Sequence, residues 1–331
     1  MSGSGRQGDS DEIPRVSACW LRKSVRPEQR GLYNGCQTPA AGCQGVIWEV
    51  PAARLKGGNE PVRTIAQVPG VLSKDGSQVF GWASGLALDT HGNFFGVGEG
   101  DDEDGHDGVL WEVSPPAKTG GKYSFEIIHS FCTIRDKSNA CVDGEDPVVG
   151  GVVVKDGVLY GATQNGGGGY SYATPCCYQT GLGNGIIYSM TPPAKSGESW
   201  TFKVLHELVD YNHNGSDAPS YDVHQPSGPP VFSSAGALVL PTLAGGAFDV
   251  TKANPYGYPI QGGVISIDLP GGGFSIVNNA FGSDQGPLRA GPWLPYGPLS
   301  LGTNGDYYGA SGYITATDGQ RQGNTIYQVI P

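Results

Sequence analysis

Carboxylate, amide, imidazole and aromatic side chains recur just before short apolar segments of this sequence. Such a mixture suits sugars, because their C–H faces stack on aromatic rings while their hydroxyl groups need hydrogen-bond donors and acceptors. Tyrosines that break the surrounding sequence pattern add to this set. We therefore predict carbohydrate as the ligand. The predicted ligand-binding residues are Trp82, Asp146, Tyr172, His224, Gln225, Tyr256, Trp293 and Tyr296.

The same segments hold carboxylates that could cleave a glycan. A glycoside hydrolase needs two carboxyl groups, about 5–5.5 Å apart for retention and about 6.5–9.5 Å apart for inversion. The catalytic candidates are Asp146, Asp217 and Asp222, with His224 as an acid or base. A glycoside hydrolase or polysaccharide lyase is thus the alternative to a binding protein, and a protein-recognition or matrix module is the second alternative.

An acidic segment at 99–107 is the densest cluster of charge in the chain. Oxygen ligands from Asp101, Asp104 and Asp107 around Gly105 could bind Ca²⁺, although their spacing departs from the EF-hand pattern. A solvated acidic loop is the other interpretation. We predict no other cofactor.

The seven cysteines indicate an oxidising compartment. Cys36 and Cys43 flank a short loop between two predicted strands, as do Cys132 and Cys141, so each pair can reach disulfide geometry. Neighbouring Cys176 and Cys177 could bond to each other, or either could bond to Cys19. We expect an extracellular or periplasmic protein whose leader is absent from this numbering.

An internal repeat predicts the elements that position these residues. The segment GVIWEV at 45–50 returns in altered form four times, at intervals of 61 to 78 residues. We align the aromatic position of the copies as Trp48, Trp111, Tyr188, Ser266 and Tyr327. Recurrence of this kind indicates stacked copies of one supersecondary unit.

Each copy contains four short apolar segments with period-two alternation, set between Gly, Asn and Asp turns. This pattern predicts strands, named A to D here in chain order. Four-stranded antiparallel units repeated around an axis are the blades of a β-propeller. We therefore predict an all-β, five-bladed β-propeller as a single domain over 13–331, after a flexible tail over 1–12.

The fifth copy ends after strand C, so its blade lacks one strand. The apolar segment Ile13 to Lys23 could supply it by pairing with Asn324 to Ile330. Such pairing of N- and C-terminal segments would close the ring and protect two edge strands. The alternative is an open array that needs a second chain.

One copy matches a known pattern. DGEDPVVGGVVVKDGVLYGATQNGG at 143–167, followed by GNGIIYSMTP at 183–192, resembles the bacterial GloVer tandem-repeat family. Units of that family run DGxxP…GLxxxxxGxLYGxTxxGGxxGxGxVFxLTP. The resemblance implies an extracellular propeller and assigns no catalytic residue.

Composition excludes several classes of partner. The net charge of −11 argues against nucleic acid and anionic membranes, since both are bound by basic patches. The longest apolar run, at 236–248, is interrupted by Pro241 and is too short to cross a membrane. We expect an acidic, secreted monomer without membrane insertion.

The long, divergent connections are all B to C or D to A, which emerge on one face of an antiparallel blade. Binding residues concentrate on variable loops held by a rigid frame, so we place the site on that face. Other polar residues have structural explanations. His129 and His206 share a repeat position that accepts Ala66, and Asp143 occupies a recurring turn position.

Overall fold

The chain is all-β in the part that the computed structural model describes, where there is no helix and every sheet is antiparallel. The described residues are 16–19, 45–50, 58–59, 61–68, 71–72, 78–79, 85–98, 108–137, 139–147, 151–167, 183–195, 197–208, 223–245, 262–278, 292–315, 321–322 and 325–331.

These strands form five successive sheets and a small hairpin. The first sheet contains β1 (Val16–Cys19), β2 (Gly45–Glu49) and β3 (Arg63–Val68). The second contains β6 (Ala87–Leu88), β7 (Phe94–Gly98), β8 (Val109–Ser114) and β9 (Ser124–Ser130). The hairpin pairs β4 (Val71–Leu72) with β5 (Gln78–Val79).

The third and fourth sheets each have an interrupted first strand. The third contains β10 (Glu145–Pro147), β11 (Val153–Lys155), β12 (Val158–Asn165), β13 (Ile186–Thr191) and β14 (Thr201–Glu207). The fourth contains β15 (Val223–Pro226), β16 (Val231–Phe232), β17 (Leu238–Gly245), β18 (Gly263–Ile267) and β19 (Phe274–Asn278). The fifth contains β20 (Pro292–Leu301), β21 (Tyr307–Thr315), β22 (Arg321–Gln322) and β23 (Thr325–Val329).

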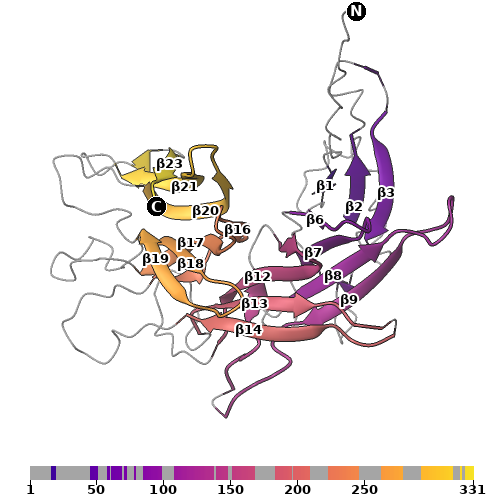
Figure 1. Ribbon diagram of the computed structural model, residues 1–331, viewed down its shortest axis with the longest axis horizontal. Coiled ribbons are helices and arrows are strands. Elements are labelled where there is room, and N and C mark those ends of the chain that lie inside the picture. Colours follow the sequence, from indigo (N-terminus) through magenta and orange to yellow (C-terminus); the bar gives the residue numbers. More distant parts are fainter. Residues whose placement is uncertain are drawn as a thin grey trace, which may run out of the picture.

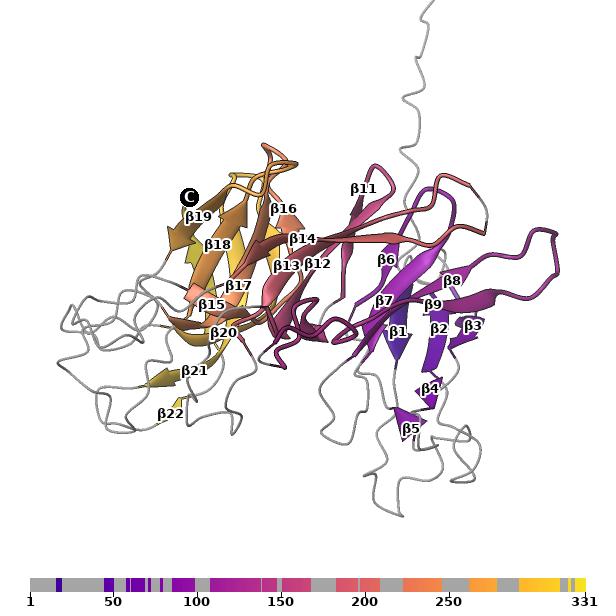
Figure 2. The same cartoon turned by 90° about the horizontal axis from the view of Figure 1, so that it is seen from below.

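The five sheets follow one another around an arc, with the first and the fifth at its two ends (Figure 1). Strands from the start of each unit lie next to those of the neighbouring unit, as β6 contacts β11, β12 contacts β15, and β17 contacts β20. Figure 2 shows the same order from below. The arrangement agrees with the strand order predicted for the repeat.

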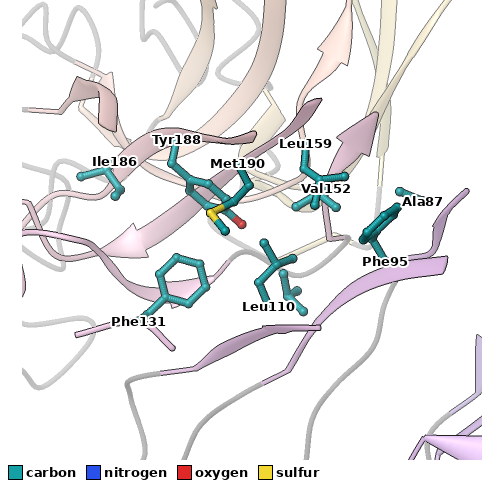
Figure 3. Close-up of a cluster of buried hydrophobic side chains, with 10 residues drawn as sticks. Ala87, Phe95, Leu110, Phe131, Val152, Leu159, Ile186, Tyr188 and Met190 are labelled. Carbon is teal, nitrogen blue, oxygen red and sulfur yellow. The ribbon is translucent and has the colours of Figure 1, made fainter. Parts of the chain in front are cut away.

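Each sheet packs face to face on the next through an apolar layer. Between the second and third sheets, Leu110 and Phe95 meet Tyr188, Met190 and Leu159, all of them almost wholly buried (Figure 3). Equivalent layers join the first to the second sheet, the third to the fourth and the fourth to the fifth. Burial of apolar surface is the main force that stabilises such stacking.

A β-bulge in strand D aligns the repeats more accurately than the sequence does. In the first four sheets its extra residue lies opposite the step that follows Ile47, Leu110, Ile187 and Val264 of strand C. The residue after it is Trp48, Trp111 and Tyr188 in the first three sheets, and Ile265 in the fourth. Assigning Ser266 to this position is therefore wrong by one residue, because Ile265 takes the buried place of the aromatic ring.

Strand B supplies a small residue opposite each aromatic ring. Gly96, Gly161 and Gly309 lie directly across from Trp111, Tyr188 and Tyr327. A Cβ on Gly161 would lie 2.4 Å from the hydroxyl oxygen of Tyr188, so the ring covers bare backbone. The fourth sheet has no ring, and there Leu240 faces Ile265.

Glycine and proline meet where one unit joins the next. Gly108 and Gly185 begin strand C in their units with φ of 84° and 95°, a conformation that favours glycine. A Cβ on Gly108 would lie 2.3 Å from Cδ of Pro147, and one on Gly185 would lie 2.7 Å from Cδ of Pro226. The recurring proline, Pro147 in β10 and Pro226 in β15, thus packs on the preceding sheet.

The predicted closure of a ring by strand pairing is not confirmed. Val16–Cys19 pairs with β2 in the first sheet, where Ser17 lies across from Trp48. It therefore takes the strand B position of the first unit. The strand that it was expected to meet, β23, pairs with β21.

Candidate functional site

Three of the predicted site residues begin equivalent strands. Asp146 lies in β10, His224 in β15 and Trp293 in β20, and each strand pairs with the end of strand B in its sheet. Pro147, Pro226 and Pro295 follow in the same register, opposite Thr163, Thr242 and Ser311. The repeat therefore brings these segments to one edge of successive sheets, and we call β10, β15 and the first half of β20 the rim.

Two rim residues have backbone conformations that side chains seldom adopt. Asp146 and Gln225 occupy the same repeat position, with φ of 55° and 57°. Non-glycine residues at positive φ are uncommon, and they concentrate at functional sites where the surroundings hold them in place. The repetition of this geometry in two sheets shows that it belongs to the fold of the rim.

Hydrogen bonds hold both residues. The Asp146 carboxylate accepts a bond of 2.9 Å from Nδ2 of Asn165, which ends β12. The backbone N–H of Gln225 donates to the carbonyl of Asn184 at 2.9 Å, and this bond joins the third and fourth sheets. Gln225 is buried, whereas Asp146 is partly exposed. Of the two, Asp146 can present its carboxylate to a ligand.

Hydroxyl groups behind the rim satisfy the backbone at the start of strand C. The Thr163 hydroxyl donates to the carbonyl of Asn165 at 2.6 Å and accepts from the N–H of Ile186 at 3.2 Å. In the next sheet, the Thr242 hydroxyl accepts from the N–H of Gly263 at 3.0 Å. This repeated support fixes the ends of the strands from which the long connections leave.

One buried amide has no partner in the described part of the chain. Nδ2 of Asn184 makes no hydrogen bond there, although Asn184 is only 1% exposed. A buried donor without a partner is costly. The backbone carbonyl of Asn184 accepts the N–H of Gln225, so the backbone of Asn184 lies beside the rim.

A disulfide loop leads into the rim. Cys132 and Cys141 are bonded, as the sequence predicted. Just after the loop, Asp143 is buried and accepts bonds from the N–H and hydroxyl of Thr133 and from the N–H of Ile134. Burial alone would raise the pKa of Asp143, but these bonds and His129, 3.5 Å away, outweigh it and lower that pKa. Asp143 is thus a structural carboxylate.

His129 and His206 are packing residues. His129 stacks on Phe202 at 4.2 Å between ring centroids, and His206 stacks on Phe274 at 4.5 Å. Each histidine in strand D thus covers a phenylalanine in strand D of the next sheet. The equivalent residues in the first and fourth sheets are Ala66 and Asn278. Each pairs with the strand C residue that precedes the bulge, as the two histidines do.

The opposite edge of the sheets has tight turns whose backbone N–H groups are hydrogen-bonded within the turn. Asp89 accepts the N–H groups of His91 and Asn93 at 2.8 and 2.9 Å. Ser233 in the fourth sheet accepts the N–H of Ala237 in the same way, at 3.0 Å. These local bonds leave the rim as the better candidate for a site.

Several predicted residues fall beyond the described part. The structure places the backbone of His224, Trp293 and Tyr296 in β15 and β20. Those outside it are Trp82, Asp101, Asp104, Asp107, Tyr172, Asp217, Asp222, Tyr256, Cys36, Cys43, Cys176 and Cys177. Among the residues described, no group of three or more His, Cys, Asp or Glu side chains could hold a metal ion.

Sequence reasoning missed Asn165, Asn184 and the hydroxyls of Thr163 and Thr242. The sequence did contain a signal for the two threonines. Thr163 and Thr242 occupy the same repeat position near the end of strand B, among apolar residues. Asn184 gave no such signal, since it precedes strand C among glycines.

No known protein family matches this chain, and no curated protein is significantly similar to it. Within the described ranges, no helix is long and apolar enough to cross a membrane.

Proposed function

We propose that this protein is a secreted, five-bladed β-propeller that binds carbohydrate at the rim. The observation that carries the proposal is the repeated rim itself, where Asp146 and Gln225 share one backbone geometry in successive sheets. Its Asp146 carboxylate is partly exposed and offers an acceptor for a sugar hydroxyl. The two residues before the recurring proline are 145–146, 224–225 and 293–294, with sequences ED, HQ and WL. Because these pairs differ from sheet to sheet, the rim suits a ligand without symmetry.

The propeller architecture is supported by the order of the sheets. Five successive antiparallel sheets pack face to face, and contacts between neighbouring units involve the strands that a propeller places near its axis. The segment that resembles the GloVer repeat forms β10 to β13, with its glycines at the start of strand C and opposite Tyr188. Both observations favour a GloVer-type propeller.

Secretion is supported by the Cys132–Cys141 bond, since disulfides persist in oxidising compartments. The bond closes the connection that leads into β10. It therefore holds the segment that leads into the rim by a covalent bond.

The proposal is tested by comparing two aspartates in a glycan-binding assay. Asp146 and Asp156 both have positive φ, at 55° and 52°, but Asp156 lies in a tight turn at the opposite edge. Asn tolerates this conformation, so Asp146→Asn and Asp156→Asn both leave the backbone unchanged. We expect Asp146→Asn to weaken binding about tenfold or more, the scale of a hydrogen bond to a charged group, and Asp156→Asn to have no effect.

Equal binding by the two variants, or no retention of any glycan, would overturn the proposal. A reducing-sugar assay on the retained glycans separates binding from cleavage. Release of reducing ends that stops in Asp146→Asn would identify a glycoside hydrolase instead.

A further inference from the structure

The fifth sheet exposes a residue that is fully buried in every other sheet. Ile47, Leu110, Ile187 and Val264, which precede the bulge, are all 0% exposed. Ile326 holds the same position in β23 and is 81% exposed. Its neighbour across the strand pair, Ala310, is exposed too, although the equivalent Ala162 is buried.

The first sheet shows the complementary departure. Trp111, Tyr188, Ile265 and Tyr327 follow the bulge position and are at most 6% exposed, because each faces the preceding sheet. Trp48 holds this position in the first sheet, which has no preceding sheet, and is only partly buried. Each end of the arc therefore exposes a face that is covered in the other sheets: the Ile326 face at one end and the Trp48 face at the other.

Each of the four apolar layers between described sheets joins these two kinds of face. The Leu110 face of the second sheet packs on the Tyr188 face of the third, and the Ile187 face of the third packs on the Ile265 face of the fourth. The uncovered Ile326 face and the uncovered Trp48 face are the matching pair. Large apolar faces are rarely left in water.

We propose that the fifth sheet packs, through Ile326, on the Trp48 face of the first sheet of the same chain. The arc then closes into a ring by packing of faces rather than by pairing of chain ends. A first sheet on the same chain has a high effective concentration, so it competes well with that of a second copy. The inference rests on the five-bladed architecture proposed above and adds how it closes.

Ile326 has a matched control in Ile330. Both are isoleucines in the C-terminal segment, two alternations apart on one face, and Ile330 is 73% exposed. Residues at the Ile330 position in other sheets are the polar Ser114, Thr191 and Asp268, so closure leaves it in water. Ile326→Asp should lower the Tm by several degrees, and Ile330→Asp should change it by about one degree or less. Equally small effects would overturn the inference.

A double-mutant cycle identifies the partner face. Trp48→Ala and Ile326→Ala should each lower the Tm, and the double variant should lower it by less than the sum. Strict additivity would contradict contact between the two residues.

Light scattering separates closure within one chain from association of two. A monomer mass across a hundredfold range of concentration is expected, with a Tm that does not depend on concentration. A dimer that dissociates in Ile326→Asp would overturn closure within the chain in favour of a second copy. Glycan binding is tested with Asp146→Asn and Asp156→Asn, and ring closure is tested with variants of Ile326 and Trp48. Either proposal can therefore fail while the other holds.

Discussion

Asp143 and Asp146 lie three residues apart and have different roles. Asp143 is buried and accepts hydrogen bonds from Thr133 and Ile134, whereas Asp146 is partly exposed and accepts one from the Asn165 amide. The burial of Asp143 and its bonds to two backbone N–H groups fit the turn role that the repeat predicts for it.

Asp143→Asn should destabilise the protein by roughly 2–3 kcal/mol at pH 7, because the bonds from Thr133 and Ile134 go to a buried charge. The folded pKa of Asp143 is lowered, so its contribution is present above the ordinary aspartate pKa and is lost as pH falls through the folded value. Urea unfolding from pH 7 to pH 3 should show the gap between wild type and variant narrowing. Asp136→Asn, inside the disulfide loop and exposed, is the control; a constant gap would contradict the role of Asp143.

His206 should make stability depend on pH near neutrality. Burial lowers the pKa of His206, against an opposing effect of Glu207. Its stabilising contribution is therefore complete above the unfolded pKa of about 6.5 and declines as pH falls toward the folded value. His206→Phe keeps the stacking on Phe274 and should lose less Tm than wild type between pH 7 and pH 5. His91→Gln, in an exposed turn, should behave as wild type, and identical slopes for all three would refute this role.

At the scale of elements, strands B and C are matched as pairs. A large ring faces glycine in the second, third and fifth sheets, and Leu240 faces Ile265 in the fourth. The two solutions fill the same layer with different shapes, which is what close packing of an interior requires. The pair, rather than either residue, is the unit that the repeat preserves.

Gly161→Leu should destabilise the third sheet by about 1–3 kcal/mol, because its side chain would collide with Tyr188. Adding Tyr188→Ile reproduces the pair of the fourth sheet, and the double variant should be more stable than the sum of the single effects predicts. Chemical denaturation of the four proteins measures the coupling. Additive losses would show that the two residues do not share one site.

At the scale of the whole molecule, the first and the last described strands lie in different sheets. The strand Val16–Cys19 protects the edge of β2, while β23 completes the fifth sheet beside β21. The stability of the first sheet thus depends on a strand far from β2 in sequence. Pairing of distant segments is what only a folded chain can provide.

Deletion of residues 1–19 should lower the Tm by several degrees and speed amide exchange in β2, because β2 loses one of its two antiparallel partners. Exchange in β23 should stay as it is in wild type. Deletion of residues 1–12 should change neither measurement, since the sequence predicts no strand there. Faster exchange in β23, with β2 unaffected, would instead favour pairing of the chain ends.

The sequence by itself determined the strands, the repeat, the all-β class and the Cys132–Cys141 bond. Each of these depends on residues close together in the chain: period-two alternation, glycine turns, and two cysteines that flank one short loop. It also identified Asp146 as a site candidate, because the residue before strand A has the same place in every copy.

Only the tertiary structure decided where Val16–Cys19 pairs, that Ile265 replaces the aromatic ring, and that His129 and His206 stack on phenylalanines of the next sheet. The bulge in strand D shifts its register against strand C by one residue, and pairing between distant strands leaves no local trace in the sequence. The position of Gln225 likewise depends on a contact between sheets, since its N–H finds its acceptor on Asn184 of the preceding sheet.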